Sequence, residues 1–243
     1  MRLAVIGIGL MGGSLALTLK RKGFVSNVIG VDNNTQHQAE ALALGLVDEI
    51  MTLEEAVKQS DIIAIATPVN IAEKLLPTIL DLVDQQVVFD VGSTKESIVN
   101  IANSHANKGR FVPTHPMWGT EFSGPSAAQQ DAFLEKATVI CNADTVDADA
   151  LLKVESLYQA LGMHIVNMDA MKHDIHVAYV SHISHITSFA LANTVLEKEK
   201  ESDAIFELAS GGFESTVRLA KSNAAMWVPI FMQNKENVLD VLN

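Results

Sequence analysis

Short hydrophobic runs alternate with longer amphipathic segments over the first two-thirds of the chain. Runs of about four residues predict strands, and segments with apolar positions three and four apart predict helices. The predicted strands are 3–6, 28–31, 49–52, 62–66, 87–91, 110–113, 138–141 and 164–168. The predicted helices are 12–22, 35–44, 53–59, 71–82, 94–106 and 147–160, and Pro77 should kink or break the fourth of them. Strands that alternate with helices of these lengths predict an α/β fold with a doubly wound, mostly parallel sheet.

The pattern changes after Met168, where the strand-like runs end. Helical spacing continues over 169–200, and a charged stretch follows at 197–203. A double glycine at 211–212 should break the chain before short helices at 214–222 and 224–243. We therefore expect two domains, 1–168 around the sheet and 169–243 all-helical. The last segment is still helical at the final residue, which suggests a truncated chain or helices completed by a partner chain, and we expect a homodimer through this domain.

Composition narrows the class of partner. Hydrophobic residues make up 48% and charged residues 19%, which is enough for a large core. The net charge of −12 argues against nucleic acid, which needs a basic surface, but leaves an anionic small substrate possible. The single cysteine, Cys141, is expected in the core, and one thiol fits a cytoplasmic protein without a disulfide framework. We find no signal-peptide pattern and no run of ~18 apolar residues, so no membrane partner is expected.

A glycine-rich turn links the first predicted strand to the first helix. Gly7, Gly9 and Gly12 have the spacing of a dinucleotide-binding turn, with Leu10 and Met11 between the last two. Such glycines permit a tight turn, close approach of a pyrophosphate, and close packing of helix on strand. Asp32 follows the next strand, 20 residues after Gly12, where a carboxylate would bind the adenine ribose hydroxyls. The fold is therefore expected to be a Rossmann domain.

The cofactor expected at this turn is NAD. A carboxylate at Asp32 repels the 2′-phosphate of NADP, and no arginine occurs among the three residues that follow it. Thr67 and Pro68 come directly after the fourth strand, at the sheet edge where ligands bind in such folds. They are expected either to form a lip over the cofactor or simply to end the strand.

Polar loops follow two later strands, and both should reach the same sheet edge. Ser93 lies in the loop 90–95, and His115 opens the loop 115–121. Histidine is a natural general base near neutral pH, so His115 could act on a substrate beside the nicotinamide. The alternative is a loop histidine with a structural hydrogen bond.

The helical domain adds polar groups on an otherwise apolar helix. His182 and His185 are three residues apart and share a face with Ser181, which indicates a solvated site or a hydrogen-bonded network. No metal is expected, because the four histidines between 173 and 185 lie on one helix and cannot all converge on one ion. Arg218 could bind a carboxylate through two parallel hydrogen bonds, or form a surface ion pair.

Six segments together resemble the prephenate/arogenate dehydrogenases of tyrosine biosynthesis. They are GIGLMGGSLA at 7–16, DVGSTK at 90–95, HPMWGTEFSG at 115–124, HD at 173–174, SHISH at 181–185 and GGFESTVRLAKSNAAMW at 211–227. They occur in the family's order and spacing over nearly the whole chain. The resemblance implies an NAD-dependent oxidative decarboxylation, which would convert prephenate to 4-hydroxyphenylpyruvate.

The same resemblance implies roles for individual residues. The family's catalytic histidine falls on His115, and the serine that orients it falls on Ser93. The arginine that binds a substrate carboxylate falls on Arg218, while His185, with His182 beside it, matches the substrate pocket. Thr120 and Glu121 match the entrance of that pocket. Trp118 stands where the family often has a small residue, so the shape of the pocket could differ here.

Three other functions remain open at this point. An arogenate dehydrogenase would have the same site and would act on a side chain with an amino group in place of the keto group. Another Rossmann dehydrogenase with a helical domain could act on a hydroxy acid or an imine, with a lysine or aspartate as the acid. A non-catalytic NAD-sensing module would keep the glycine turn without needing Ser93, His115 and Arg218 together.

Overall fold

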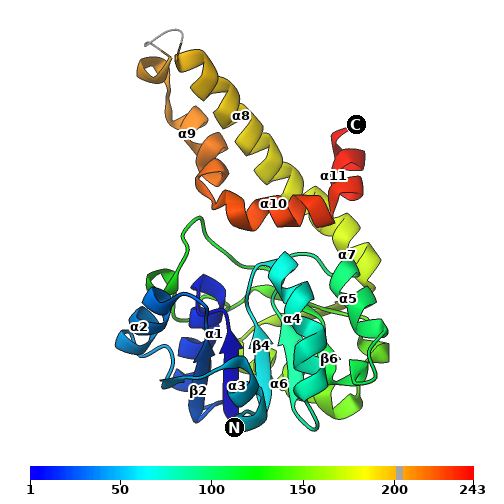
Figure 1. The fold of residues 1–243 in the computed structure, drawn as a ribbon. Helices are drawn as coiled ribbons and strands as arrows, with labels where there is room; N and C mark the ends of the chain where they lie inside the picture. The colour runs from blue at the N-terminus through cyan, green and yellow to red at the C-terminus, as the bar shows by residue number, and fades with distance from the viewer. Residues whose placement is uncertain (201–204) are drawn as a thin grey trace. The chain divides into compact units, whose positions relative to one another are not determined.

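A computed structural model describes residues 1–200 and 205–243 (Figure 1). The chain divides into two compact units, Met1–His173 and Asp174–Asn243, which are described separately.

The first unit is built on a six-stranded parallel sheet with the order β3-β2-β1-β4-β5-β6. Its strands are β1 Arg2–Ile6, β2 Asn27–Val31, β3 Glu49–Ile50, β4 Ile62–Ile65, β5 Val87–Asp90 and β6 Phe111–Val112. The strand order reverses between β1 and β4, so the ligand crevice of this fold lies beside the turn after β1. The predicted doubly wound parallel sheet is confirmed.

Helices cover both faces of this sheet (Figure 1). They are α1 Leu10–Arg21, α2 Thr35–Ala43, α3 Leu53–Gln59, α4 Val69–Leu82, α5 Glu96–Asn103 and α6 Ala148–Leu161. Side chains of α1, α2 and α6 pack into the core on one face, and those of α3, α4 and α5 pack on the other. The expected break at Pro77 is wrong, because α4 continues through it. Burial of Leu76, Ile79 and Leu80 compensates for the hydrogen bond that proline cannot make.

A second, three-stranded sheet was not expected. It has the order β7-β8-β9 and consists of β7 Thr114–Pro116, β8 Ala137–Cys141 and β9 His164–Met168, with β7 antiparallel to β8. His115 therefore lies in a strand, opposite Val139, and the prediction that it opens a loop is wrong. Three short 3-10 helices, at Lys108–Arg110, Pro125–Ala127 and Ala143–Thr145, complete the unit.

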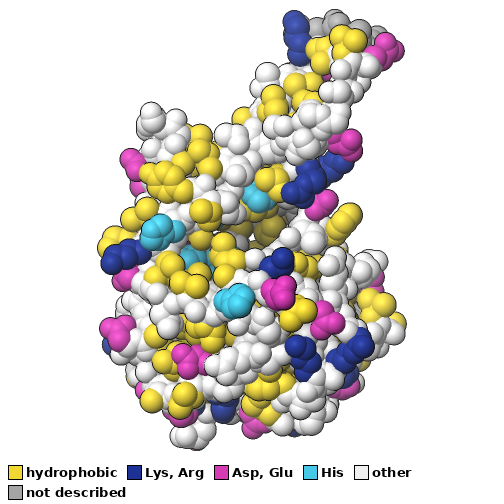
Figure 2. Space-filling view, turned by 180° about the vertical axis from the view of Figure 1, so that it is seen from behind, with side chains coloured by type: hydrophobic (Ala, Val, Ile, Leu, Met, Phe, Trp, Pro, Cys, Tyr) yellow, Lys and Arg dark blue, Asp and Glu magenta, His cyan; other side chains and the backbone are white. Residues whose placement is uncertain are grey.

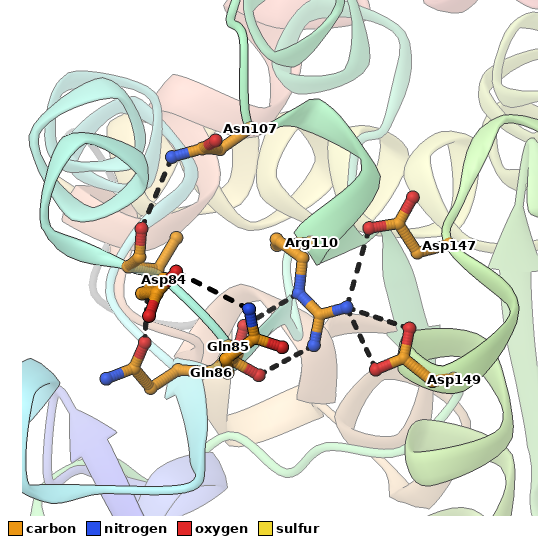
Figure 3. Close-up of polar contacts among 8 residues, drawn as sticks. Asp84, Gln85, Gln86, Asn107, Arg110, Asp147 and Asp149 are labelled. Carbon is orange, nitrogen blue, oxygen red and sulfur yellow. Dashed lines mark hydrogen bonds and ion pairs between the residues drawn. The ribbon is translucent and has the colours of Figure 1, made fainter.

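Arg110 binds two other segments of this unit (Figure 3). Its Nη1 donates to both carboxylate oxygens of Asp149, at 2.8 and 2.9 Å, and lies 3.4 Å from Asp147. Its Nη2 donates to the carbonyl oxygen of Gln85, at 2.7 Å, and its Nε to that of Gln86, at 3.2 Å. One guanidinium thus joins the start of α6 to the turn before β5, and this arginine serves the fold.

The described part of the second unit contains helices joined by turns, and no strand. The helices are α7 Ala170–Val177, which begins in the first unit, then α8 Ile183–Glu199, α9 Gly211–Val217, α10 Ala224–Gln233 and α11 Lys235–Leu242. A π-helical turn, Ala178–His182, joins α7 to α8, and 3-10 turns occupy Phe206–Leu208 and Arg218–Lys221. Of the charged stretch predicted at 197–203, positions 201–203 lie outside the described residues.

Two expectations for this unit are wrong. The double glycine does not break the chain, since Gly211 begins α9 and Ser210 precedes it in an extended conformation. The segment 224–243 forms two helices, because Asn234 ends α10 with a non-helical backbone before α11 begins.

Large apolar side chains remain exposed on the helical unit, among them Val180, Leu208 and Met232, each more than 60% exposed. Figure 2 shows hydrophobic side chains on the surface of this unit, beside the atoms drawn in grey. Within the described residues, none of the helices combines the length and the apolar character that crossing a membrane requires.

Candidate active site

The glycine turn after β1 has no room for side chains at two of its positions. Gly7 has φ of +93°, and a Cβ there would lie 2.7 Å from the carbonyl oxygen of Ala66. A Cβ at Gly12 would lie 2.2 Å from the carbonyl oxygen of Gly7. At Gly9, by contrast, a Cβ would meet no described atom within 4 Å. The turn is therefore tight where strand and helix meet, and open where a ligand could approach the start of α1.

Asp32 is fixed beside this turn. Its Oδ2 accepts the backbone N–H of Ile8 at 3.0 Å, and its Oδ1 accepts that of Asn34 at 2.9 Å. Each carboxylate oxygen keeps a second lone pair for a ligand hydroxyl. Leu10 and Met11 form the half-buried first turn of α1. An open glycine, a helix start and an oriented carboxylate fit the pyrophosphate and adenine ribose of a dinucleotide.

Thr67 and Pro68 lie after β4, next to the same turn, since Gly7 approaches the backbone of Ala66 and Thr67. Pro68 is exposed and precedes the first residue of α4. The hydroxyl oxygen of Thr67 is buried and has no hydrogen-bond partner among the described residues. A buried hydroxyl without a partner is costly, so this group suits a ligand contact.

A buried polar network holds the loop after β5 against β7. Lys95 Nζ donates to Asp90 Oδ2 and, at 2.8 Å, to the carbonyl oxygen of Thr114. Asp90 also accepts the N–H groups of Gly92, at 2.9 Å, and of Thr114, at 3.1 Å. Lys95 and Asp90 are 0% and 1% exposed. Such a pair survives burial because further hydrogen bonds satisfy both charges.

The network extends to Tyr158 on α6, whose hydroxyl contacts Thr114 Oγ1. Burial raises the pKa of Tyr158 far above its usual range, so the hydroxyl keeps its proton and remains a donor. Ser93, which is half-buried, lies in the loop that Asp90 and Lys95 fix, and His115 directly follows Thr114. The two predicted catalytic residues thus belong to segments joined by the same network.

His115 has a partner that the sequence reasoning missed. Its Nδ1 lies 2.9 Å from Nε2 of His173, at the start of α7. His115 is 8% exposed and His173 is fully buried. The motif HD at 173–174 contained this histidine, but a separation of 58 residues gives no periodic signal for the contact.

The segment after β7 carries Trp118, Thr120 and Glu121. Trp118 packs edge-on against Phe133, with ring centroids 5.3 Å apart, so its indole contacts the core of the first unit. Thr120 accepts the N–H of Phe122 at 3.3 Å. Glu121 lines an open cavity of about 530 Å³ with Phe122 and Ser126. Glu121 therefore lies at a hollow surface, and Thr120 directly precedes it in the chain.

In the helical unit, His185 stacks on Trp227 with ring centroids 3.5 Å apart. His185 Nδ1 lies 3.1 Å from the carbonyl oxygen of Ser181. Burial lowers the pKa of His185, the Ser181 carbonyl opposes this shift, and the positive charge of Arg218 lowers the pKa further. Arg218 is exposed at the end of α9. The unit thus combines a stack of two largely buried aromatic rings with an exposed guanidinium, which suits an anionic ring compound.

His182 has a more structural position than predicted. It is 1% exposed, its Nδ1 lies 3.0 Å from Asn234 Nδ2, and its ring meets Trp227 edge-on. Asn234 also donates to the carbonyl oxygen of Asp174 at 2.7 Å. His182 therefore holds α10 and its end against the long helix. The described residues contain no group of three or more histidine, cysteine, aspartate or glutamate side chains that could hold a metal ion.

Two family models match the chain. The model described as "Prephenate dehydrogenase, nucleotide-binding domain" matches residues 15–167, and "Prephenate dehydrogenase, dimerization domain" matches residues 169–243. The prephenate dehydrogenase of Bacillus subtilis (strain 168) is 31% identical over 238 residues. That alignment covers 96% of this chain but 64% of the relative, so the chain spans less than two-thirds of that relative's length.

Solved structures agree in fold over the whole chain. The prephenate dehydrogenase from A. aeolicus, in complex with hydroxyphenyl propionate and NAD+, superposes with a TM-score of 0.92 at 29% identity, covering 100% of this chain and 85% of that one. The arogenate dehydrogenase of Synechocystis superposes with a TM-score of 0.77 at 28% identity, covering 100% and 87%.

Proposed function

Because the chain belongs to the prephenate dehydrogenase family, we propose that it is an NAD-dependent enzyme that oxidises and decarboxylates prephenate to 4-hydroxyphenylpyruvate, a step of tyrosine biosynthesis. The observation that carries the proposal is the buried His115, held through Nδ1 in the unit that also carries the open glycine turn. The A. aeolicus relative, which holds NAD+ together with a hydroxyphenyl compound, supports this assignment.

We assign the cofactor to the nucleotide-binding domain, residues 1–168. Gly7, Gly9, Leu10, Met11 and Gly12 would hold the pyrophosphate at the start of α1. Asp32 would accept the ribose hydroxyls, and its negative charge favours NAD over NADP. Thr67 and Pro68 would line the same crevice, with the Thr67 hydroxyl as a ligand donor. NAD+, when bound, supplies the acceptor for a hydride.

The chemistry requires one base. His115 takes the proton from the ring hydroxyl as the carbon that bears it is oxidised, and Ser93 orients that hydroxyl and the histidine. Loss of carbon dioxide and formation of the aromatic ring supply much of the driving force. The protein therefore contributes mainly position and one proton transfer.

We propose that the helical domain, residues 169–243, recognises the anionic substrate. Arg218 binds a substrate carboxylate through two parallel hydrogen bonds. His185, which its lowered pKa keeps neutral at pH 7, presents the Trp227-stacked ring to the substrate. The edge of the His182 ring contacts Trp227, which His185 stacks on. Glu121, which lines a surface cavity, and Thr120 would form the entrance.

We also propose a homodimer formed through the helical domain. The family model for this region is described as a dimerization domain, and the exposed Val180, Leu208 and Met232 supply apolar surface for such a contact. The single buried thiol, Cys141, fits a cytoplasmic enzyme.

Arogenate is the second candidate substrate, because the Synechocystis arogenate dehydrogenase shares the fold over the whole chain. It differs from prephenate only on the side chain, away from the reacting ring. One experiment separates the candidates: NADH or NADPH formation is followed with each substrate and each dinucleotide. We expect turnover with prephenate and NAD+. Turnover with arogenate alone would reassign the substrate, and NAD+ binding without turnover of either would indicate a non-catalytic NAD-binding module.

A further inference from the structure

We propose that His173 is a positioning residue, which fixes the tautomer and orientation of His115 so that Nε2 is the basic nitrogen. The proposal rests on the proposed function only in giving His115 the role of the base. The contact itself is a property of the chain and can be tested without substrate.

The geometry defines a hydrogen bond between two imidazoles. His115 Nδ1 and His173 Nε2 are 2.9 Å apart, and the two rings meet edge to face at 73°, with centroids 5.1 Å apart. Both side chains are buried. A bond of this length needs one proton between the two nitrogens, so one ring donates and the other accepts.

The direction of this bond decides whether His115 can act as a base. If His115 Nδ1 carries the proton and donates it to His173, Nε2 has a lone pair and can take a proton from a substrate hydroxyl. In the reverse direction His115 Nδ1 accepts, and the single proton of the neutral ring lies on Nε2. In that form Nε2 has no lone pair and cannot take a proton from the substrate. His173 sets the productive direction if it carries its own proton at Nδ1 and accepts at Nε2.

A neutral acceptor suits this reaction better than a carboxylate would. A carboxylate at this distance would favour the imidazolium form of His115 before the substrate is bound. Imidazole accepts the same proton without placing a negative charge beside His115. After proton transfer, His115 still donates through Nδ1, and no rearrangement of the pair is needed.

The fold holds His173 firmly enough for this role. Asn142, with φ of +49°, accepts the N–H of Ala170 through Oδ1 at 2.7 Å, and Asp169 Oδ1 accepts the N–H of Met171 at 2.9 Å. Ala170 belongs to the same buried cluster as Val139, the residue opposite His115 in the β7–β8 pair. The first turn of α7 and the strand with His115 are thus both fastened to β8, and His173 lies one turn after Ala170.

The direct test is the tautomer of His115, read from the 15N chemical shifts of its ring by NMR at pH 8 in the full chain without ligands. We expect the Nδ1–H form in the native protein. In His173→Leu the acceptor is lost, and we expect a mixture with the Nε2–H form. An Nε2–H tautomer in the native protein would overturn the proposal, even if the leucine variant did not fold.

Kinetics supply the second readout. His173→Leu should lower kcat about tenfold or more, with little change in KM or in the Kd of NAD+. His173→Gln offers an amide oxygen as acceptor and should recover most of the loss. His176→Leu, on the same helix but exposed, is the matched control and should leave kcat unchanged. Equal losses in the glutamine and leucine variants, or a change confined to KM, would contradict a positioning role.

These results are separable from the proposed function. If the protein shows the Nδ1–H tautomer in the NMR spectrum but turns over neither substrate, the role of His173 stands and the proposed reaction is wrong. If the protein is active but shows the Nε2–H tautomer, the proposed reaction stands and the role of His173 is wrong.

Discussion

The two units hold their proposed functional residues in different ways. In the first unit, His115 is bonded to a buried histidine and directly follows Thr114, which belongs to a network with Asp90, Lys95 and Tyr158. In the helical unit, Arg218 is exposed and His185 is half-buried, stacked on Trp227.

This difference matches what each group must do. A base works only when its nitrogen is held at the right place and in the right protonation state, which favours a rigid, buried surrounding. A guanidinium that captures a carboxylate can reach it by rotating a long side chain. Changes in the first unit should therefore lower turnover or stability, and changes in the second should mainly weaken substrate binding.

The largest effect is expected for His115→Asn. Loss of the base should lower kcat at least ~100-fold, within the usual ~10²–10⁴-fold for one general base. The Kd of NAD+, measured by titration calorimetry, should stay near its native value, because the glycine turn and Asp32 are untouched. Near-native turnover in this variant would remove His115 from the reaction.

Lys95→Met tests the rigidity of the first unit. It leaves the Asp90 carboxylate buried without its counter-charge, which typically costs about 3–5 kcal/mol of unfolding free energy. Urea denaturation measures this loss. The double variant Asp90→Leu with Lys95→Met should recover part of it, because neither charge is then left alone. If Lys95→Met were as stable as the native protein, the Asp90–Lys95 ion pair would not stabilise this site.

Arg218→Gln tests the binding half of the comparison. The amide keeps hydrogen-bonding capacity but loses the charge, so KM should rise about 10- to 100-fold, the equivalent of ~1.5–3 kcal/mol for a hydrogen bond to a charged group. Arg218→Lys keeps the charge without the two parallel donors, so its KM should lie between those of the native protein and Arg218→Gln. If kcat fell instead while KM stayed constant, the division between the units would be wrong.

The smallest effect concerns the pKa of His185, which NMR titration measures. The Arg218 charge contributes to lowering it, so Arg218→Gln should raise it toward the ordinary value of 6.5. Because folding lowers the pKa of His185, the unfolded state binds a proton at this imidazole at a higher pH than the folded state does. The unfolding free energy should therefore decrease as the pH falls through about 6.5 toward the lower folded pKa, and His185→Gln should lose this dependence. If the pKa of His185 does not change in Arg218→Gln, the two side chains do not interact electrostatically.

The sequence predicts the main sheet well because its signals are local. Every strand of that sheet except the two-residue β3 contains a run of apolar residues, and the helices between them have apolar positions three and four apart. The predicted ends of the strands and helices in the first unit therefore differ from the observed ones by at most three residues. The exception is β7, whose residues Thr114, His115 and Pro116 have no apolar alternation. This strand exists because β8 pairs with it, and pairing between distant segments leaves no periodic signal.

For the candidate site, sequence reasoning finds residue types and misses their partners. His115 and Arg218 stand out because of their chemistry and their neighbours in the sequence. The contact of His115 with His173 and the stacking of His185 on Trp227 depend on how distant segments pack, across 58 and 42 residues. The prediction that Ser181, His182 and His185 share a helix face assumed an uninterrupted α-helix. The π-helical turn at Ala178–His182 contradicts that assumption.

That π-helical turn has a consequence for comparing relatives. A π turn accommodates one residue more than an α turn, so the helix contains the equivalent of a one-residue insertion between His173 and His185. A homologue with a regular helix here would align with a single-residue gap. Deleting one residue within 178–182 should convert the π turn to a regular α turn and leave the later side chains on their present faces of the helix. The helix can therefore carry one residue more or one fewer at this turn without moving His185 to another face.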